Sequence, residues 1–450
     1  MALTPSRTAA FDILRKVACE GAYAADLLHA ASLSALSPAD RGLCTELVMG
    51  CLRWQSTLDA SLDAQMRRPN ADPEVRIALR MGLYQMRHLE RIPSRAAVDQ
   101  SVELVKRAHK LSAAPFVNAV LRRLSEHPQG MGLSQSDDAD DLALDYAHPQ
   151  WLVERWLKAY GFKATRKILA AGQQPPASAL RLADAGDAAS LEREGQRLAP
   201  GALLASARLH LSGDLTQTHA FAEGRANLQD EGSQLVAELA GHGSRILDCC
   251  AAPGGKTLVL AARNPQARIT ALELHPHRAK LLAERVAYCA NVTVLTGDAA
   301  QLDAVLAPEE RFDLILADVP CSGTGTLARN PEIKWKLTAA DLVDLQRRQS
   351  GILRSALKVL APGGRLVYST CSLEAEENEQ VVEKILAEQN GAAGEGTAAL
   401  RVLDCGAELR QLDDFLPAAD IDSYLSGPYL RTLPGVHPCE GFFAAVLVKG

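Results

Sequence analysis

Five short apolar segments alternate with helical stretches after residue 230, and this alternation constrains the fold more than any other feature of the chain. Each segment holds four to six residues and is rich in aliphatic side chains, as a buried strand is. Parallel strands need a crossover helix between them, so the alternation predicts a doubly wound, largely parallel sheet. The predicted strands are residues 245–249, 268–272, 292–295, 312–317 and 365–369.

Two further domains are predicted ahead of this sheet, as a length of 450 residues allows. Residues 1–130 show apolar positions three and four residues apart, which predicts an all-α bundle. Residues 142–228 predict a small α+β module, and residues 229–450 an α/β Rossmann-like domain. The polar segment 126–141 is the predicted linker, and the Gly/Ala-rich run 390–399 is a predicted loop.

Charge is unevenly distributed along the chain. The net charge of −6 argues against a protein that coats nucleic acid indiscriminately. Residues 1–130, however, carry 17 Lys and Arg against 13 Asp and Glu, and residues 142–182 are also basic. We expect any contact with a polyanion to begin there, although an ordinary solvated helical surface has the same composition.

Cysteine usage and hydropathy narrow the class of protein. The ten cysteines include no CxxC pair, so we predict neither a disulfide framework nor a metal site. No apolar run reaches the roughly 20 residues of a membrane span, and the first seven residues lack a secretory signal pattern. We therefore expect a cytoplasmic protein without a membrane partner, and a monomer because no apolar stripe suggests obligate assembly.

Two of the predicted strands run directly into cysteines. The segment that begins at Leu314 ends in Cys321, and the segment that begins at Leu366 ends in Cys371. Because the carboxyl ends of parallel strands meet at one edge of a sheet, we expect both thiols there. A lone cysteine is more often a small buried residue, but two of them at adjacent strand ends favour covalent chemistry.

A glycine-rich turn follows the first predicted strand and is the candidate cofactor loop. Ligands of open parallel sheets bind beyond the strand ends, where Gly254 and Gly255 let the backbone approach a cofactor closely. A phosphate-binding loop would need glycine where Cys250 stands, and no GxGxxG spans the turn, which argues against nucleotide triphosphatases and dinucleotide enzymes. The candidate cofactor-binding residues here are Cys250, Ala251, Ala252, Pro253, Gly254, Gly255 and Lys256.

Acidic residues stand at the ends of three successive strands: Glu273, Asp298 and Asp318. A carboxylate after the second strand can accept hydrogen bonds from ribose hydroxyls, and one after the third can approach an adenine amino group. Any one of these acids alone would more often be a helix cap or a solvated loop residue. Together they indicate a nucleoside-containing cofactor.

These motifs resemble those of class I S-adenosylmethionine-dependent methyltransferases of the RNA cytosine-C5 type, the RsmB/Nop2/Sun group. The resemblance covers about residues 229–450. Segments in the first 125 residues resemble the NusB RNA-binding helical fold, and the combination resembles the bacterial branch that acts on 16S ribosomal RNA. The matching segments are 97–105, 116–123, 248–256, 318–325, 330–335, 369–372 and 437–443.

The resemblance implies S-adenosylmethionine as the cofactor, 16S ribosomal RNA as the partner, and methylation of a cytidine at carbon 5. That carbon is a poor nucleophile, and a thiolate that adds at carbon 6 supplies the missing electron density. By resemblance, Cys371 is this nucleophile, and Cys321 assists removal of the carbon 5 proton or release of the enzyme. Asp318 is implied to contact the base, and Lys256 either supports this chemistry or neutralises nearby acids.

Several alternatives stay open on the sequence alone. A tRNA or DNA cytosine methyltransferase shares the chemistry, and a non-catalytic NusB-like RNA-binding factor shares the domains. Two structures are compatible with Trp335 and its neighbours Lys334 and Lys336. One is a stacking and phosphate-binding wall, and the other is a packed Trp between solvated lysines. For His437 the two alternatives are a contact with RNA and a turn histidine whose ring nitrogens both form hydrogen bonds within the protein.

Overall fold

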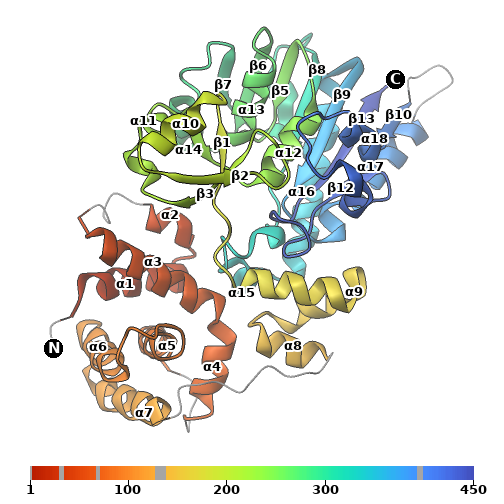
Figure 1. The fold of residues 1–450 in the computed structure, drawn as a ribbon. Helices are drawn as coiled ribbons and strands as arrows, with labels where there is room; N and C mark the ends of the chain where they lie inside the picture. The colour runs from red at the N-terminus through yellow and green to blue at the C-terminus, as the bar shows by residue number, and fades with distance from the viewer. Residues whose placement is uncertain (1–2, 30–34, 67–70, 127–137, 393–398) are drawn as a thin grey trace. The chain divides into compact units, whose positions relative to one another are not determined.

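The computed structural model describes residues 3–29, 35–66, 71–126, 138–392 and 399–450 (Figure 1). Most of the predicted linker at 126–141 and of the predicted loop at 390–399 lies outside the described residues. The chain divides into two compact units, Met1–Pro175 with Leu327–Lys336, and Pro176–Thr326 with Leu337–Gly450. In the described ranges, no helix is both long and apolar enough to cross a membrane.

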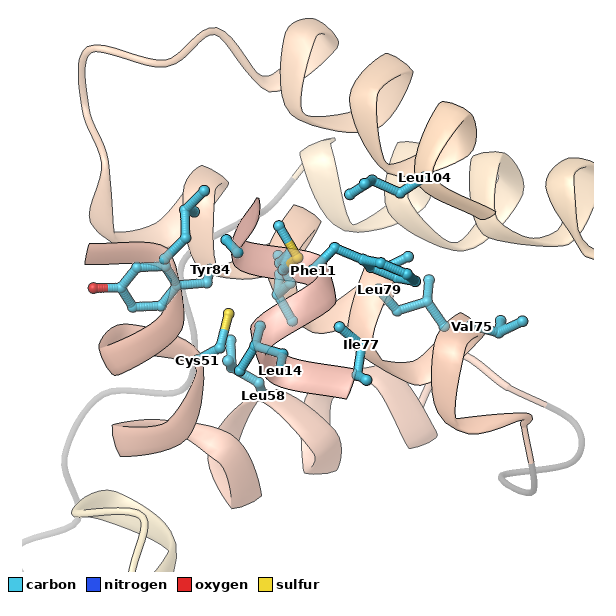
Figure 2. Packing of buried hydrophobic residues seen from close by; sticks show 14 of the residues in the cluster. Phe11, Leu14, Cys51, Leu58, Val75, Ile77, Leu79, Tyr84 and Leu104 are labelled. Atoms are coloured by element: carbon cyan, nitrogen blue, oxygen red, sulfur yellow. The ribbon is translucent and has the colours of Figure 1, made fainter. Parts of the chain in front are cut away.

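The first unit contains helices and no strand among its described residues, as the bundle periodicity predicts. The helices between residues 5 and 126 turn their apolar faces to a shared core, in which Phe11, Leu58, Leu79 and Leu104 are at most 1 % exposed (Figure 2). The helices are α1 (Pro5–Cys19), α2 (Ala24–Leu28), α3 (Pro38–Arg53), α4 (Gln55–Asp63), α5 (Pro73–His88), α6 (Ser94–Arg107), α7 (Ala114–Glu126), α8 (Ala139–Asp145), α9 (Gln150–Gly172) and α15 (Ile333–Lys336).

The segment that ends in α15 packs within this first unit and uses carbonyls at the end of α3, which lack partners inside the helix. Lys334 Nζ donates to Arg53 O (2.9 Å), and Trp335 Nε1 donates to Leu52 O (2.6 Å). Lys334 is 1 % exposed, and its burial, together with the charge of Arg53, lowers its pKa well below the usual range. Both predicted roles of Lys334, in a phosphate-binding wall or as a solvated lysine, are therefore wrong.

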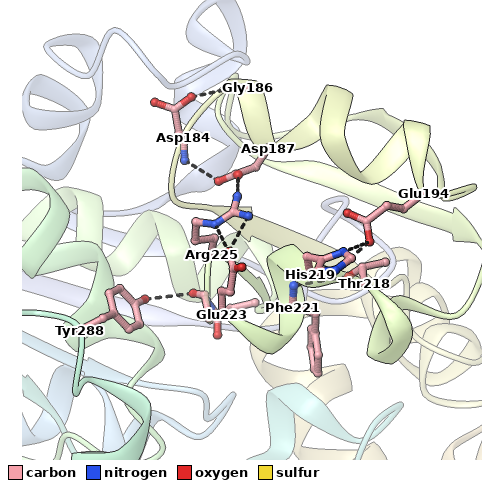
Figure 3. A network of polar contacts seen from close by, with 12 residues as sticks. Asp184, Gly186, Asp187, Glu194, Thr218, His219, Phe221, Glu223, Arg225 and Tyr288 are labelled. Carbon is pink, nitrogen blue, oxygen red and sulfur yellow. Dashed lines mark hydrogen bonds and ion pairs between the residues drawn. The ribbon is translucent and has the colours of Figure 1, made fainter.

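The second unit opens with a four-stranded antiparallel sheet in the order β2-β3-β1-β4, which confirms the predicted α+β module. Figure 3 shows Arg225 between Asp187 and Glu223, with which it forms ion pairs. Tyr288 Oη donates to Gly224 O (3.0 Å). Because Tyr288 lies beyond the module, this bond ties the module to the rest of the unit. The elements are β1 (Ala179–Leu182), α10 (Gly186–Arg193), β2 (Arg197–Pro200), β3 (Arg208–Ser212), α11 (His219–Ala222) and β4 (Ala226–Leu228).

Nine strands among the described residues of this unit form a mixed sheet in the order β11-β12-β13-β9-β8-β5-β6-β7, with β10 beside β13. The strands β5 (Arg245–Asp248), β6 (Arg268–Glu273), β7 (Val292–Thr296), β8 (Phe312–Asp318) and β9 (Leu360–Thr370) pair in parallel, which confirms the doubly wound sheet. The antiparallel strands β10 (Leu400–Leu403), β11 (Leu425–Ser426), β12 (Tyr429–Arg431) and β13 (Phe443–Lys449) were not predicted.

Helices bury the parallel strands on both faces. Leu314 and Leu316 of β8 pack with α12 and α13, whereas Ile315 and Ala317 pack with α16 and α17 on the opposite face. A strand buried on both faces reads as a continuous apolar run, which is why the sequence reveals it. Besides α10 and α11 of the module, the α-helices of this unit are α12 (Glu231–Ala240), α13 (Gly255–Arg263), α14 (Pro276–Arg285), α16 (Ala339–Val359), α17 (Glu379–Ala392) and α18 (Cys405–Arg410).

Candidate active site

The candidate active site lies at the carboxyl ends of the parallel strands. Asp248, Glu273 and Asp318 are the last residues of β5, β6 and β8, and Asp298 follows β7 by two residues. From β5 the chain moves outward through β6 to β7, and then returns to place β8 on the other side of β5. Ligands of doubly wound sheets bind beyond the strand ends at such a reversal of strand order.

The glycine-rich turn joins β5 to α13, so the N-terminus of α13 lies at the same edge. Gly254 has a φ of +102°, and a Cβ there would lie 2.9 Å from Leu282 Cδ1. Glycine alone adopts this conformation without strain. Gly255 is the first residue of α13, and a Cβ on it would lie 3.2 Å from Cδ of Gln229, which is tighter than an ordinary contact.

The remaining residues of the predicted cofactor loop form the turn itself. The N–H of Gly254 donates to Ala251 O (2.7 Å), which closes the turn. Ala251 is buried, Cys250 and Ala252 are half-buried, and Pro253 is exposed. The structure therefore places all of these residues in one loop beside the strand ends.

Asp248 contributes a buried carboxylate to this loop. Its Oδ2 accepts a hydrogen bond from Thr257 Oγ1 (2.7 Å), and its Oδ1 has no hydrogen-bond partner among the described residues. Burial raises the pKa of Asp248 to about 7, although the bond from Thr257 acts in the opposite direction. A buried oxygen without a partner beside a glycine turn is a place for a donor group of a ligand.

Glu273 and Asp298 also lie at this edge, and each already holds one backbone N–H. Glu273 is 4 % exposed, and its Oε1 accepts from His275 N (3.0 Å). Asp298 caps the short helix that follows β7 by accepting from Ala300 N (2.9 Å). A carboxylate offers about four acceptor positions, so both side chains keep acceptors for a hydroxyl or an amine.

The two cysteines meet because β8 and β9 are neighbours, with Asp318 paired in register with Ser369. Cys321 Sγ and Cys371 Sγ lie 3.3 Å apart, and both thiols are free and half-buried. The hydrogen bond to Cys371 and burial raise the pKa of Cys321 well above its usual range, and the charges of Cys371 and Glu377 act in the same direction. Cys321 is therefore a protonated thiol at neutral pH.

Asp318 lies beside the thiols and is held by two donors. Lys256 Nζ donates to Oδ2 (2.7 Å), and Ser369 Oγ donates to Oδ1 (2.8 Å). Burial lowers the pKa of Lys256, but the charge and hydrogen bond of Asp318, together with the charges of Cys371 and Asp248, outweigh it, so the net pKa is raised and the ammonium persists. The Asp318 side chain remains 28 % exposed, which leaves it accessible to a substrate.

Sequence reasoning missed Glu377, which lies in a short helix after β9 and is 0 % exposed. Its carboxylate accepts from Ser322 N (2.8 Å) and also bonds the hydroxyls of Ser322 and Ser372. The run Glu376-Glu377 reads locally as a solvated acidic turn, so no signal in the sequence could have found it.

Both ring nitrogens of His437 form hydrogen bonds with backbone groups of the protein, which favours the second of its two predicted roles. Its Nδ1 accepts from Leu433 N (2.8 Å), so its Nε2 carries the proton and donates to Ser423 O (3.0 Å). The ring also packs against Tyr424, with 4.4 Å between the ring centroids. His437 is thus a turn histidine with both nitrogens satisfied.

The residues at the strand ends fit S-adenosylmethionine. The glycine turn admits close approach of a ligand, Glu273 and Asp298 offer acceptors to hydroxyl and amino groups, and the unpartnered Oδ1 of Asp248 can accept from another donor. Strand order, turn and carboxylates together define a methyltransferase of the class I fold.

Comparisons with known proteins agree with this class of protein. The model of the 16S rRNA methyltransferase RsmB/F family matches residues 238–448, that of the NusB family residues 4–126, and that of the ferredoxin-like domain of RsmF/B-like methyltransferases residues 148–185. The probable ribosomal RNA small subunit methyltransferase B of Bacillus subtilis strain 168 is 38 % identical over 407 residues, which cover 86 % of this chain and 89 % of the relative.

A second relative, the ribosomal RNA small subunit methyltransferase B of Vibrio cholerae, is 32 % identical over 454 residues, covering 98 % of this chain and 97 % of its own. The crystal structure of a methyltransferase homologue from Pyrococcus horikoshii covers 71 % of this chain and 100 % of its own, with 26 % identity and a TM-score of 0.56. The chain belongs to the 16S rRNA methyltransferase RsmB/F family, whose members use S-adenosylmethionine.

Proposed function

We propose that this protein transfers a methyl group to carbon 5 of one cytidine in the RNA of the small ribosomal subunit, at the cytidine 967 site that the resemblance implies. The observation that carries the proposal is the pair of sulfur atoms 3.3 Å apart beside the Lys256–Asp318 ion pair. S-adenosylmethionine, when bound, supplies the sulfonium methyl. The proposed binding residues are the glycine turn, Glu273, Asp298 and Asp318.

Cys371 is the proposed nucleophile. Its thiolate forms a bond to carbon 6 of the cytosine, and the electron pair of the carbon 5–carbon 6 double bond becomes available at carbon 5 for attack on the methyl group. The Asp318 carboxylate accepts a hydrogen bond from the exocyclic amine and thus holds the ring in place. The Lys256 ammonium and the Ser369 hydroxyl orient that carboxylate.

Cys321 is the proposed helper in breaking the adduct. As the carbon 6–sulfur bond breaks, its electron pair returns to Cys371, and the Cys321 thiol gives a proton to that sulfur. The resulting Cys321 thiolate then takes the proton from carbon 5, whose electron pair restores the ring double bond. The 3.3 Å separation and the raised pKa of Cys321 suit a thiol that begins this step protonated.

The helical domain, for which we propose residues 1–130, and the module at 142–228 are proposed to hold the RNA around the target. The target base must be unstacked to reach the two thiols, which single-stranded loops of RNA allow. Phosphate contacts by basic residues would hold the surrounding RNA, so affinity should fall as salt concentration rises.

Methylation of naked 16S RNA and of assembling small subunits with isotope-labelled S-adenosylmethionine tests the function. We expect the label in 5-methylcytidine, at a single position located by bisulfite sequencing. Purified tRNA serves as the control substrate. Label in tRNA alone would indicate a tRNA enzyme, and RNA binding without any methylation would indicate a non-catalytic factor.

Substituting Gly254→Ala is expected to weaken binding of S-adenosylmethionine. A side chain at this φ costs about 1–3 kcal/mol of strain, which corresponds to a dissociation constant about 5- to 150-fold higher if the loop relaxes on losing the ligand. Titration calorimetry measures the change. Gly351→Ala on α16 is the matched control, because its Cβ would lie at an ordinary 3.7 Å from Ala300 Cβ. Equal affinity in the two variants would contradict a role of the turn in binding.

A further inference from the structure

Glu377 is a fully buried carboxylate that the proposed mechanism does not use. Among the described residues, no Lys, Arg or His lies within ion-pair distance of it. A buried charge without a counter-ion is unfavourable unless several hydrogen bonds compensate for lost hydration. The residues that donate these hydrogen bonds therefore show which parts of the chain the Glu377 carboxylate holds together.

Four hydrogen bonds converge on the two carboxylate oxygens. Oε1 accepts from Ser322 N (2.8 Å) and from Gln349 Nε2 (2.9 Å). Oε2 accepts from the hydroxyls of Ser322 and Ser372, which also lie 3.0 Å from each other. Hydrogen bonds to an ionised acceptor are about twice as strong as neutral ones.

Three of these four donors belong to the two loops that carry the thiols, and the fourth, Gln349, lies on α16. Ser322 directly follows Cys321, and Ser372 directly follows Cys371. Gln349 also donates to the carbonyl of Pro320 (3.0 Å), the residue before Cys321. The two loops leave different strands, so neither strand alone sets the distance between the sulfur atoms.

We infer that Glu377 is a positioning residue that sets the separation of the two reactive sulfur atoms, an inference that rests on the proposed function. Proton transfer between the thiols needs hydrogen-bond contact, and a displacement of about 1 Å is enough to cost about 100-fold in rate. The charge of Glu377 also raises the pKa of the Cys321 thiol, which helps to keep its proton in place.

Two substitutions distinguish the effect of the length of the Glu377 side chain from the effect of its charge. Glu377→Asp keeps the charge but shortens the side chain, and we expect kcat to fall about 100-fold while the pH profile keeps its shape. In Glu377→Gln the charge is lost, so we expect kcat to fall similarly and the pH profile to move toward lower pH, because Cys321 then ionises more readily. KM for RNA and the affinity for S-adenosylmethionine should stay within about twofold, since the hydrogen bonds of Glu377 reach none of the residues proposed to bind the cofactor or the RNA phosphates.

The matched control is Glu379→Gln, two residues further on. It removes a carboxylate that pairs with Arg431 and contacts neither thiol loop, so we expect wild-type kcat. A trivalent arsenical, which needs two thiols in close contact, gives a second measurement without RNA. Wild-type protein and the control should bind it through Cys321 and Cys371, and both Glu377 variants should bind it at least tenfold more weakly.

Wild-type kcat and wild-type arsenical binding in the Glu377 variants would overturn the inference. Equal losses of kcat, cofactor affinity and thermal stability would overturn it as well, because they would indicate a structural role alone. If the wild-type protein binds the arsenical but methylates no RNA, the proposed function fails, and arsenical binding by the Glu377 variants still decides whether the carboxylate positions the sulfurs.

Discussion

Substituting Cys371→Ala is expected to lower methylation of RNA by about 10⁴-fold or more, to background. Without a sulfur atom to add at carbon 6, carbon 5 lacks the electron density to attack the methyl group, and loss of a covalent nucleophile removes most of the rate enhancement. Single-turnover incorporation of labelled methyl at saturating RNA and cofactor measures the effect. Calorimetry should show unchanged affinity for S-adenosylmethionine, because the glycine turn is untouched.

Cys19→Ala is the control for removal of a cysteine as such. Cys19 is exposed and lies in the other compact unit, so this variant should keep wild-type activity. Substantial methylation by Cys371→Ala, with loss of activity in Cys321→Ala instead, would assign the role of nucleophile to Cys321. That result would favour a mechanism of the DNA cytosine methyltransferase type, one of the alternatives that the sequence leaves open.

Cys321→Ala is expected to accumulate a covalent complex between protein and RNA. Cys371 still adds to the base and the methyl group is still transferred, but the neighbouring thiol that returns a proton to the leaving sulfur is missing. The adduct should appear after incubation with cofactor and RNA as a slowly migrating band on a denaturing gel that nuclease removes. Turnover should stop after about one methyl group per enzyme.

The double variant Cys321→Ala, Cys371→Ala gives the decisive control for the adduct. It should form none, because the trapped bond belongs to Cys371. An adduct in the double variant, or rapid turnover without any adduct in Cys321→Ala, would remove Cys321 from the breakdown step. The first result would point to a different nucleophile, and the second to a different proton carrier.

The parallel part of the fold was predicted closely from the sequence. The predicted strand at 312–317 is only one residue shorter than β8 (Phe312–Asp318). The match is close because residues 314–317 are buried on both faces and form a continuous apolar run that the sequence reveals. The antiparallel strands were not predicted. The two residues of β11 carry almost no local pattern, and β13 owes its position to pairing with β9, more than 70 residues earlier.

The candidate site, like the fold, was predicted only in part from the sequence. Parallel pairing places Glu273, Asp318, Cys321 and Cys371 at one edge of the sheet, and the alternation of strands and helices predicts that pairing. The ion pair of Lys256 with Asp318 joins residues 62 positions apart, and nothing in either local segment indicates it. The burial of Lys334 escaped prediction for the same reason, since the carbonyl of Arg53 that accepts its hydrogen bond lies 281 residues earlier.

The amino-acid sequence by itself determined the parallel part of the sheet, the glycine turn and the delivery of two thiols to the same strand ends, because each of these depends on a local period or a short motif. Only the tertiary structure decided how far apart the thiols lie and which groups surround them. That distance depends on hydrogen bonds such as the one from Ser322 to Glu377, which joins segments 55 residues apart. Contacts of this kind arise from packing, and a local pattern of residues carries no trace of them.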